Sequence, residues 1–370
     1  MLASARNPAP VKRIMGIVLA VLLIGGVVVA VVAGRDQDTN TATTTVRGVI
    51  GSEKGDFFKD REVVEALADE GVEVKYETSG SWAMEDRDLK GYDFAFPGSG
   101  APATALKDRL RISGELPRPF YSPLVVVART PAARVLEANG LARLNGGHTG
   151  TLRMKPYLDA VDDNRNWQQL KDAGRYPELT GRLCVISTDP LTSNSGALYL
   201  ATASYVAAGG KVASGSEDVR ATAPLMRKLI EVQGAQKTST DGPFWDFISG
   251  VGDALVLVYE SQVAEYLADE QPADDLVVLY PDTNVYSDHT LVPLTEGGRK
   301  LGELLSDDPE LRRLAVRHGF RPQGDRSEFL RATDRHKDYL NQRLTDVSQA
   351  RVPTSEVLQE MARRAKGREA

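Results

Sequence analysis

The sequence has few of the residues on which many enzymes and disulfide-rich domains depend. Its 370 residues include one cysteine, Cys184, which excludes an intramolecular disulfide and a cysteine-rich metal site. Cys184 falls in an apolar run, where packing is expected rather than catalysis. The four histidines show no spacing typical of metal ligands. A GxSxG motif and a P-loop are also absent. These gaps argue against several enzyme classes and predict no metal and no cofactor.

The chain also lacks an excess of basic residues. Its 45 Lys and Arg face 51 Asp and Glu, which gives a net charge of −6 and argues against nucleic acid as a partner. Ser287, Asp288 and His289 supply the residue types of a hydrolase triad. Adjacent residues of a strand point to opposite faces, however, so the three side chains are not expected to converge. The sequence therefore supplies no nucleophile and base, and we expect no enzymatic activity.

One long hydrophobic run does occur, near the N-terminus. Residues 14–33, IMGIVLAVLLIGGVVVAVVA, contain no charge and are long enough to span a membrane as a helix. Lys12 and Arg13 precede the run, so the N-terminus is expected in the cytoplasm and the main domain outside it. A cleaved signal peptide is the alternative, although the run is longer than a usual signal core. The expected location is the cell membrane, with a single pass.

The rest of the chain alternates between strand and helix patterns. Residues 36–45 form a polar linker, and expected strands follow at 46–50, 72–76, 92–96, 121–128, 254–259 and 276–280. Helical spacing separates them, at 60–70, 104–110, 216–233, 298–305 and 309–317 among others, and residues 131–176 are expected to be mostly helical. This alternation predicts an α/β fold. Several expected strands end in Gly/Ser loops, and in parallel sheets such loops bind ligands.

Residues 183–205, LCVISTDPLTSNSGALYLATASY, form the most informative stretch. An expected strand at 183–186 leads through a polar loop to a helix that begins near Ser193 and Asn194. The free N–H groups and the dipole of a helix N-terminus attract anions, and Ser195 adds a hydroxyl. The alternative is that Ser193 or Asn194 only caps its own helix.

Four segments in order resemble a known family. They are the strand and loop around Gly51-Ser52-Glu53-Lys54, the motif YDFAFPGS at 92–99, the motif YSPLVVV at 121–127, and the pair formed by SNSG at 193–196 and YESQ at 259–262. Together they are similar to bacterial extracellular solute-binding proteins of the type II periplasmic-binding-protein fold. Oxyanion binders and the solute-binding modules joined to von Willebrand A domains show similar patterns.

The resemblance implies two α/β lobes with a ligand held between them. Lobe one would take residues 46–128 and 272–325, and lobe two residues 129–271, after an N-terminal segment of 1–35. The ligand contacts that it implies are Ser52, Ser79, Ser99, Ser193, Asn194, Ser195, Tyr259 and Glu260.

The implied ligand is a small polar or anionic solute, with an ABC transporter permease as a further partner. Glu260 is discordant, because a buried carboxylate would repel an anion. It is expected to accept from a protonated ligand, to bind a cation or to stabilise its lobe.

The charged extension at residues 326–370 is expected to contain a helix at 355–364 and to form a solvated tail. Contact of this helix with a partner or with the membrane surface is the alternative. On that second interpretation the protein is a surface sensor or interaction protein rather than a transport component. Trp82 and Trp245 lie near predicted loops, where they would line the cleft or pack in the core.

Overall fold

The computed structural model describes residues 43–269 and 275–368, which belong to the larger of two compact units, Thr43–Ala370. The hydrophobic run at residues 14–33 lies outside the described residues. Within the described ranges, no helix is long and apolar enough to cross a membrane.

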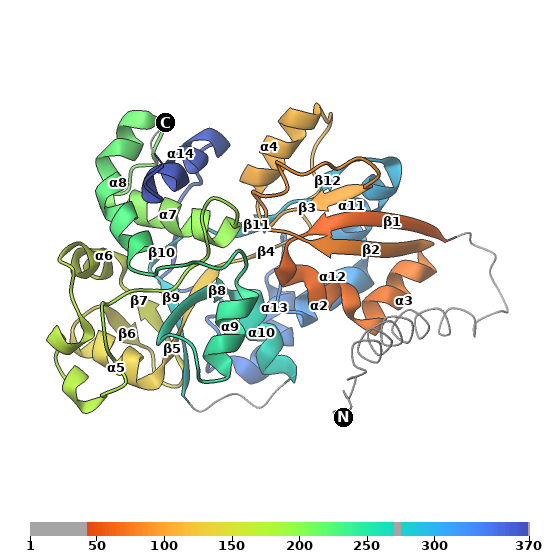
Figure 1. Cartoon of the computed structure of the whole chain (residues 1–370). Helices are drawn as coiled ribbons and strands as arrows, with labels where there is room; N and C mark the ends of the chain where they lie inside the picture. Colours follow the sequence, from red (N-terminus) through yellow and green to blue (C-terminus); the bar gives the residue numbers. More distant parts are fainter. Residues whose placement is uncertain (1–42, 270–274, 369–370) are drawn as a thin grey trace, which may run out of the picture. The chain divides into compact units, whose positions relative to one another are not determined.

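Lobe one is built on a four-stranded sheet of order β12-β3-β1-β2 (Figure 1). The pairs β1–β2 and β1–β3 are parallel, and β12 joins β3 antiparallel. The strands are β1 (Thr44–Ile50), β2 (Val72–Thr78), β3 (Phe94–Phe96) and β12 (Val292–Pro293). The helices are η1 (Ser52–Lys54), α2 (Gly55–Lys59), α3 (Arg61–Asp69), α4 (Gly100–Leu110), α11 (Glu296–Asp307) and α12 (Pro309–Arg317).

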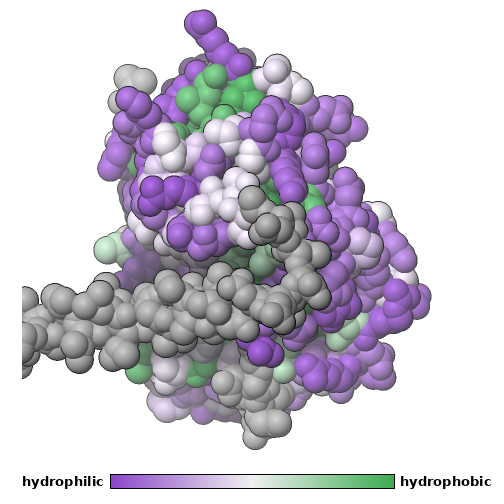
Figure 2. Space-filling model, turned by 90° about the vertical axis from the view of Figure 1, so that its right-hand side faces the viewer, coloured by the Kyte–Doolittle hydropathy of each residue, from purple (hydrophilic) through white to green (hydrophobic). Residues whose placement is uncertain are grey.

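Both faces of this sheet are buried because its side chains alternate between two apolar layers. Val46 and Ile50 of β1 point into the layer that contains α3, α11 and α12, whereas Val49 points into the layer that contains α4. The loops that follow β1, β2 and β3 are therefore held by a rigid core. The outer surface contrasts with this core: the face of the molecule in Figure 2 is mostly hydrophilic where it is coloured, with small separate hydrophobic areas.

Lobe two is built on a five-stranded sheet of order β6-β7-β9-β5-β8, in which β5 is antiparallel to both neighbours. Its strands are β5 (Leu124–Arg129), β6 (Ala142–Leu144), β7 (Thr149–Leu152), β8 (Leu255–Tyr259) and β9 (Leu276–Pro281). Its helices are α5 (Thr130–Ala138), α6 (Met154–Asp162), η2 (Trp167–Gln169), η3 (Ala173–Arg175), α7 (Asn194–Ala207), α8 (Ser216–Glu231), α9 (Asp241–Ile248) and α10 (Glu260–Asp269).

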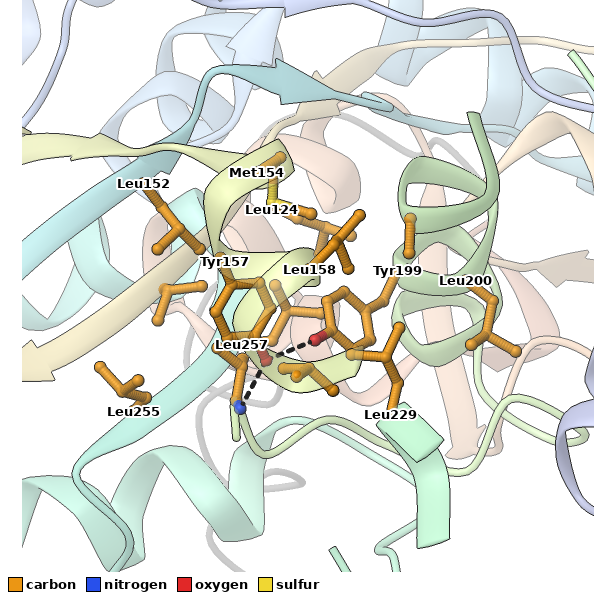
Figure 3. Close-up of a cluster of buried hydrophobic side chains, with 14 of the residues drawn as sticks. Leu124, Leu152, Met154, Tyr157, Leu158, Tyr199, Leu200, Leu229, Leu255 and Leu257 are labelled. Carbon is orange, nitrogen blue, oxygen red and sulfur yellow. Dashed lines mark hydrogen bonds between the residues drawn. The ribbon is translucent and has the colours of Figure 1, made fainter. Parts of the chain in front are cut away.

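A buried pair of tyrosines fixes α7 against this sheet (Figure 3). The hydroxyls of Tyr157 on α6 and Tyr199 on α7 lie 2.9 Å apart, and the Val185 backbone N–H donates to Tyr157 at 3.0 Å. Leucines of both helices and of β5 and β8 surround these groups. The pair thereby ties the start of α7 to the segment that precedes it.

Short strands and the C-terminal segment connect the lobes. One small sheet has the order β11-β4-β13 and another pairs β10 with β14. These elements are β4 (Phe120–Ser122), β10 (Thr283–Asn284), β11 (Ser287–His289), β13 (Arg321–Pro322), α13 (Ser327–Ala332), η4 (Asp334–His336), β14 (Ser348–Gln349) and α14 (Ser355–Ala365).

The structure differs from the sequence-based expectation in three places. Residues 183–186 form no strand, and only Ile186 makes an isolated parallel bridge, to Val256 of β8. The single strand expected at 121–128 is broken at Pro123, which has no N–H to donate, and its halves join different sheets. The β6–β7 hairpin replaces part of a region expected to be helical.

The lobe boundaries and the C-terminal extension also differ. The range expected for lobe one, 272–325, includes β9, whereas β9 pairs with β5 and β7 in the sheet of lobe two. The solvated tail was the wrong expectation for α14, whose apolar face packs on α7 and α8. Its buried side chains are Val357, Leu358, Met361, Ala362 and Ala365.

A buried ion pair joins α10 to the connecting region. The Arg321 guanidinium donates to both carboxylate oxygens of Glu260, at 2.5 and 2.8 Å, and both side chains are almost fully buried. The Tyr280 hydroxyl donates to the same carboxylate. Arg321 also donates to the backbone carbonyls of Asn341 and Gln342. The carboxylate therefore has its hydrogen-bond partners within the fold.

We expect Glu260→Gln to lower the free energy of unfolding by about 3–5 kcal/mol, because it leaves a buried guanidinium without its countercharge. Urea denaturation measures the change. The control Glu303→Gln alters an exposed glutamate of α11 and should stay within about 0.5 kcal/mol. A loss below about 1 kcal/mol for Glu260→Gln would contradict this role.

Candidate functional site

A small cavity lined mainly by hydroxyl groups lies between the two lobes. Its volume of about 10 Å³ is roughly the space that one water molecule needs. Lobe one contributes Ser52, Glu53, Ser79, Gly80 and Ser81, and lobe two contributes Ser193, Asn194, Ser195, Thr238, Ser239, Thr240 and Tyr259.

Strand ends and helix starts position these groups. Ser52 and Glu53 begin η1 directly after β1, and Ser79 follows β2. In lobe two, Asn194 opens α7 and Tyr259 ends β8. In each case a strand or helix anchors one end of the loop, so the polar group at the lobe surface has a defined position.

Asn194 is the centre of a hydrogen-bond network between the lobes. Its Nδ2 donates to the hydroxyls of Tyr259 and Ser287 at 3.0 Å each, and its Oδ1 accepts from the Ser99 hydroxyl at 2.5 Å. Ser287 in turn donates to the Gly98 carbonyl. All of these side chains are buried, so the network couples the loop after β3 to the start of α7.

Close backbone contact shows that the lobes are shut around the cavity. A Cβ atom on Gly80 would lie 2.4 Å from the Thr192 carbonyl oxygen, so only glycine permits this approach. The Trp82 N–H donates to the same carbonyl at 3.0 Å. A solute larger than water could enter this cavity only if the lobes moved apart.

A buried charged cluster supports the lobe-one wall. The Lys54 ammonium lies 2.5 Å from a Glu53 carboxylate oxygen, 3.2 Å from His289 Nδ1 and 4.7 Å from the centre of the Phe96 ring. Burial raises the pKa of Glu53, but Lys54 and His289 outweigh it, so the net shift is downward and the carboxylate is ionised. Burial and the Lys54 ammonium lower the pKa of His289 to about 4, so this imidazole is neutral at pH 7.

The structure brings most of the predicted ligand contacts together. Six of the eight predicted residues line this cavity: Ser52, Ser79, Ser193, Asn194, Ser195 and Tyr259. Ser99 lies directly behind them through its bond to Asn194. Glu260 is not part of the lining, because Arg321 and Tyr280 hold its carboxylate inside the fold.

Sequence reasoning missed Glu53, Ser81 and the hydroxyl-bearing residues at 238–240. The last group had a readable signal, since three consecutive hydroxyl side chains precede α9 in the sequence TSTD. A polar run before a helix predicts ligand binding at Ser193, and the same pattern predicts it at residues 238–240. Glu53 gave no such signal, because its partner His289 lies 236 positions away.

A second hollow of about 140 Å³ adjoins the first and shares Ser52 and Glu53 with it. Its other lining residues are Asp56, Asp241, Phe244, Trp245, Gln262, Glu265 and Tyr266. The Ser52 hydroxyl and Gln262 Nε2 both hydrogen-bond Asp241, the latter at 2.7 Å. This hollow also lies between lobe one and lobe two.

A larger hollow of about 630 Å³ lies between α12 and α13, away from these residues. Two of its arginines are already paired, Arg312 with Glu328 and Arg313 with Glu310. The hollow does not join the two lobes, so we place the candidate site between the lobes.

Two groups of catalytic type have other roles in the structure. Ser287, Asp288 and His289 contact different partners: Gly98 and Asn194, Arg118, and Lys54, respectively. Their failure to converge confirms the expectation from strand alternation. Burial raises the pKa of the Cys184 thiol to about 11, which disfavours the reactive thiolate.

The sequence matches no family model and no curated protein sequence. Its structure is similar to that of the sulfate-binding protein SubI from Mycobacterium tuberculosis, with a TM-score of 0.53, 16% identity, and 85% of this chain and 96% of that chain covered. Iron-bound HitA from Pseudomonas aeruginosa is similar with a TM-score of 0.54 and 12% identity, over 87% of this chain and 97% of that chain. An ABC transporter solute-binding protein from Thermotoga lettingae, bound with α-D-tagatose, has a TM-score of 0.52 and 14% identity, over 89% of this chain and 96% of that chain.

The fold is therefore that of two-lobed solute-binding proteins. In particular, the chain has the type II periplasmic-binding-protein fold, as the resemblance in its sequence implied. The structural similarity, rather than the sequence identity, establishes this fold.

His318 forms a titratable link near this site. Its Nε2 lies 2.8 Å from Asp60 at the start of α3, and its Nδ1 lies 2.6 Å from Glu265 on α10. Burial alone would lower the pKa of His318, but Glu265 and Asp60 outweigh it and raise the pKa. Arg317 also pairs with Asp60. The protonated imidazole thereby joins the two lobes.

A histidine whose pKa is raised on folding contributes stability below its unfolded pKa of about 6.5 and loses it as pH rises through the folded value. We expect His318→Gln to lower the free energy of unfolding by about 2 kcal/mol at pH 6 and by less at pH 9. Urea denaturation at the two pH values gives the comparison. An equal loss at both would show that the charge of His318 does not contribute.

Proposed function

We propose that this protein captures a small polar solute between its lobes, outside a membrane to which residues 14–33 anchor it. The observation that carries the proposal is the interlobe cavity, where hydroxyls from both lobes converge on one enclosed point. Similar structures come from proteins described as binders of sulfate, iron and tagatose. The captured solute would then be passed to an ABC transporter permease.

Binding without catalysis fits this arrangement. Neutral hydroxyl and amide groups can replace the hydration of a polar solute and release it again, because none of them forms a covalent bond. Opening and closing of the lobes would control entry. The bonds through Asn194 and the contact at Gly80 would re-form in each closure.

Solute capture can be tested with the full chain purified in detergent, screened calorimetrically against oxyanions, divalent metals, amino acids, sugars and organic cations. A ligand at about 100 times its Kd should stabilise the protein by about 2.7 kcal/mol. Gly80→Ala should remove most of this gain, because the added methyl group would meet the Thr192 carbonyl and hold the lobes apart.

Gly174→Ala is the matched control, since a Cβ atom there meets nothing within 4 Å. It should retain the ligand-induced gain. If no compound class stabilises a cooperatively unfolding protein, the solute-capture proposal fails and the interaction-protein alternative takes its place.

The membrane anchor can be tested separately in cells that produce the full chain. We expect the protein to stay in the membrane fraction after alkaline carbonate washing, since a span of this length inserts stably. N-terminal sequencing should find residues 1–35 intact. A soluble product that starts after residue 33 would instead show a cleaved signal peptide.

A further inference from the structure

The hollow beside the hydroxyl-lined cavity has negatively charged walls, which would repel the expected anionic solute. Asp56 of lobe one and Asp241 of lobe two line it, together with the shared Glu53. No Lys, Arg or His is among the lining residues that the structure describes. The Lys54 ammonium lies behind Glu53 and is fully buried, so the wall presents the carboxylate.

The neighbouring charges leave this surface acidic. Burial raises the pKa of Asp241, and the charges of Glu53 and Asp56 raise it further, whereas bonds from Ser52 and Gln262 oppose the rise. The Asp56 carboxylate pairs with Lys59 at 3.5 Å, an exposed contact that solvent screens. A positive charge placed here would relieve the repulsion between the carboxylates.

Three aromatic rings of lobe two also line the hollow. Phe244, Trp245 and Tyr266 lie with their ring centroids 5.7–6.1 Å apart in pairs. Trp245 is 53% exposed, so a solute that enters the hollow can reach its side chain. Aromatic faces attract cations, and the attraction strengthens when water is excluded.

A buried hydroxyl without a partner provides an independent indication of a ligand. Thr240 is 2% exposed, and its Oγ1 has no hydrogen bond within the described structure. Thr240 lines the adjoining cavity, next to Ser52 and Glu53. An unpaired buried hydroxyl costs free energy, and a polar group of a bound solute would satisfy it.

The dimensions favour an organic cation over a metal ion. A volume of about 140 Å³ is close to the roughly 150 Å³ of a cavity that holds benzene. Nowhere in residues 43–269 and 275–368 do three or more acidic, His or Cys side chains converge as metal ligands. The carboxylates instead surround a space of the size of a small ammonium or guanidinium group.

We propose that the solute is a small organic cation, whose ammonium or guanidinium group enters the pocket between Asp241 and Trp245 while its polar remainder meets the hydroxyls around Thr240. This inference rests on the proposed function and specifies its solute class. Recognition would combine charge attraction to the carboxylates with cation–π contact.

Calorimetric titration of the full chain with choline chloride and with agmatine tests the proposal, with sodium chloride at equal ionic strength as the blank. At least one of the two cations should bind. Asp241→Asn should weaken that binding about tenfold or more, and Trp245→Leu about threefold or more. Asp246→Asn changes an exposed residue of the same helix outside the pocket and should leave the affinity unchanged.

Other outcomes would overturn the inference in distinguishable ways. If sulfate or ribitol binds and neither cation does, the solute class is wrong although solute capture stands. If a cation binds equally well to the Asp241→Asn and Trp245→Leu variants, the pocket is not its site. If none of these compounds and no other solute class binds, the proposed function fails as well.

Discussion

The buried Glu260–Arg321 pair is the constraint on which the joint between the lobes depends. Glu260 begins α10 in lobe two, and Arg321 lies in the small sheet that connects the lobes. The same guanidinium donates to carbonyls of the C-terminal segment and lies 4.0 Å from the centre of the Phe329 ring. Because separating two buried charges is costly, the pair holds α10 and the connecting region in fixed relative positions.

The interlobe contacts around the cavity are smaller and neutral. Ser99, Asn194 and Ser287 meet through hydrogen bonds, and Gly80 allows one backbone to approach another. A bound solute can replace such bonds at little net cost, because each contributes only about 1 kcal/mol. α14 adds a further link, since it packs on α7 and α8 while Ser355 donates to the Ala101 carbonyl of α4. The lobes are thus joined by a buried ion pair and, around the cavity, by neutral hydrogen bonds and close backbone contact.

Charge distinguishes the two halves of the site. Around Asn194 the wall consists mainly of hydroxyls and an amide, with the Glu53 carboxylate at the border with the second hollow. Around Asp241 it is acidic and aromatic. The Lys54 ammonium keeps Glu53 ionised from behind, so the negative wall persists at neutral pH. A solute that satisfies both halves must carry polar groups and positive charge together.

The resemblance to a known family implied six residues of the cavity wall. Local pattern in the sequence by itself determined the α/β class and most strands and helices. These features depend on alternation and on turns between neighbouring residues, which a single chain displays directly. Only the tertiary structure decided the partner of Glu260, the packing of α14 and the acidic wall around Asp241. Each of these depends on residues far apart in the chain: Arg321 lies 61 positions from Glu260, and Ser355 lies 254 from Ala101. Such pairings follow from how the lobes pack, which local sequence does not encode.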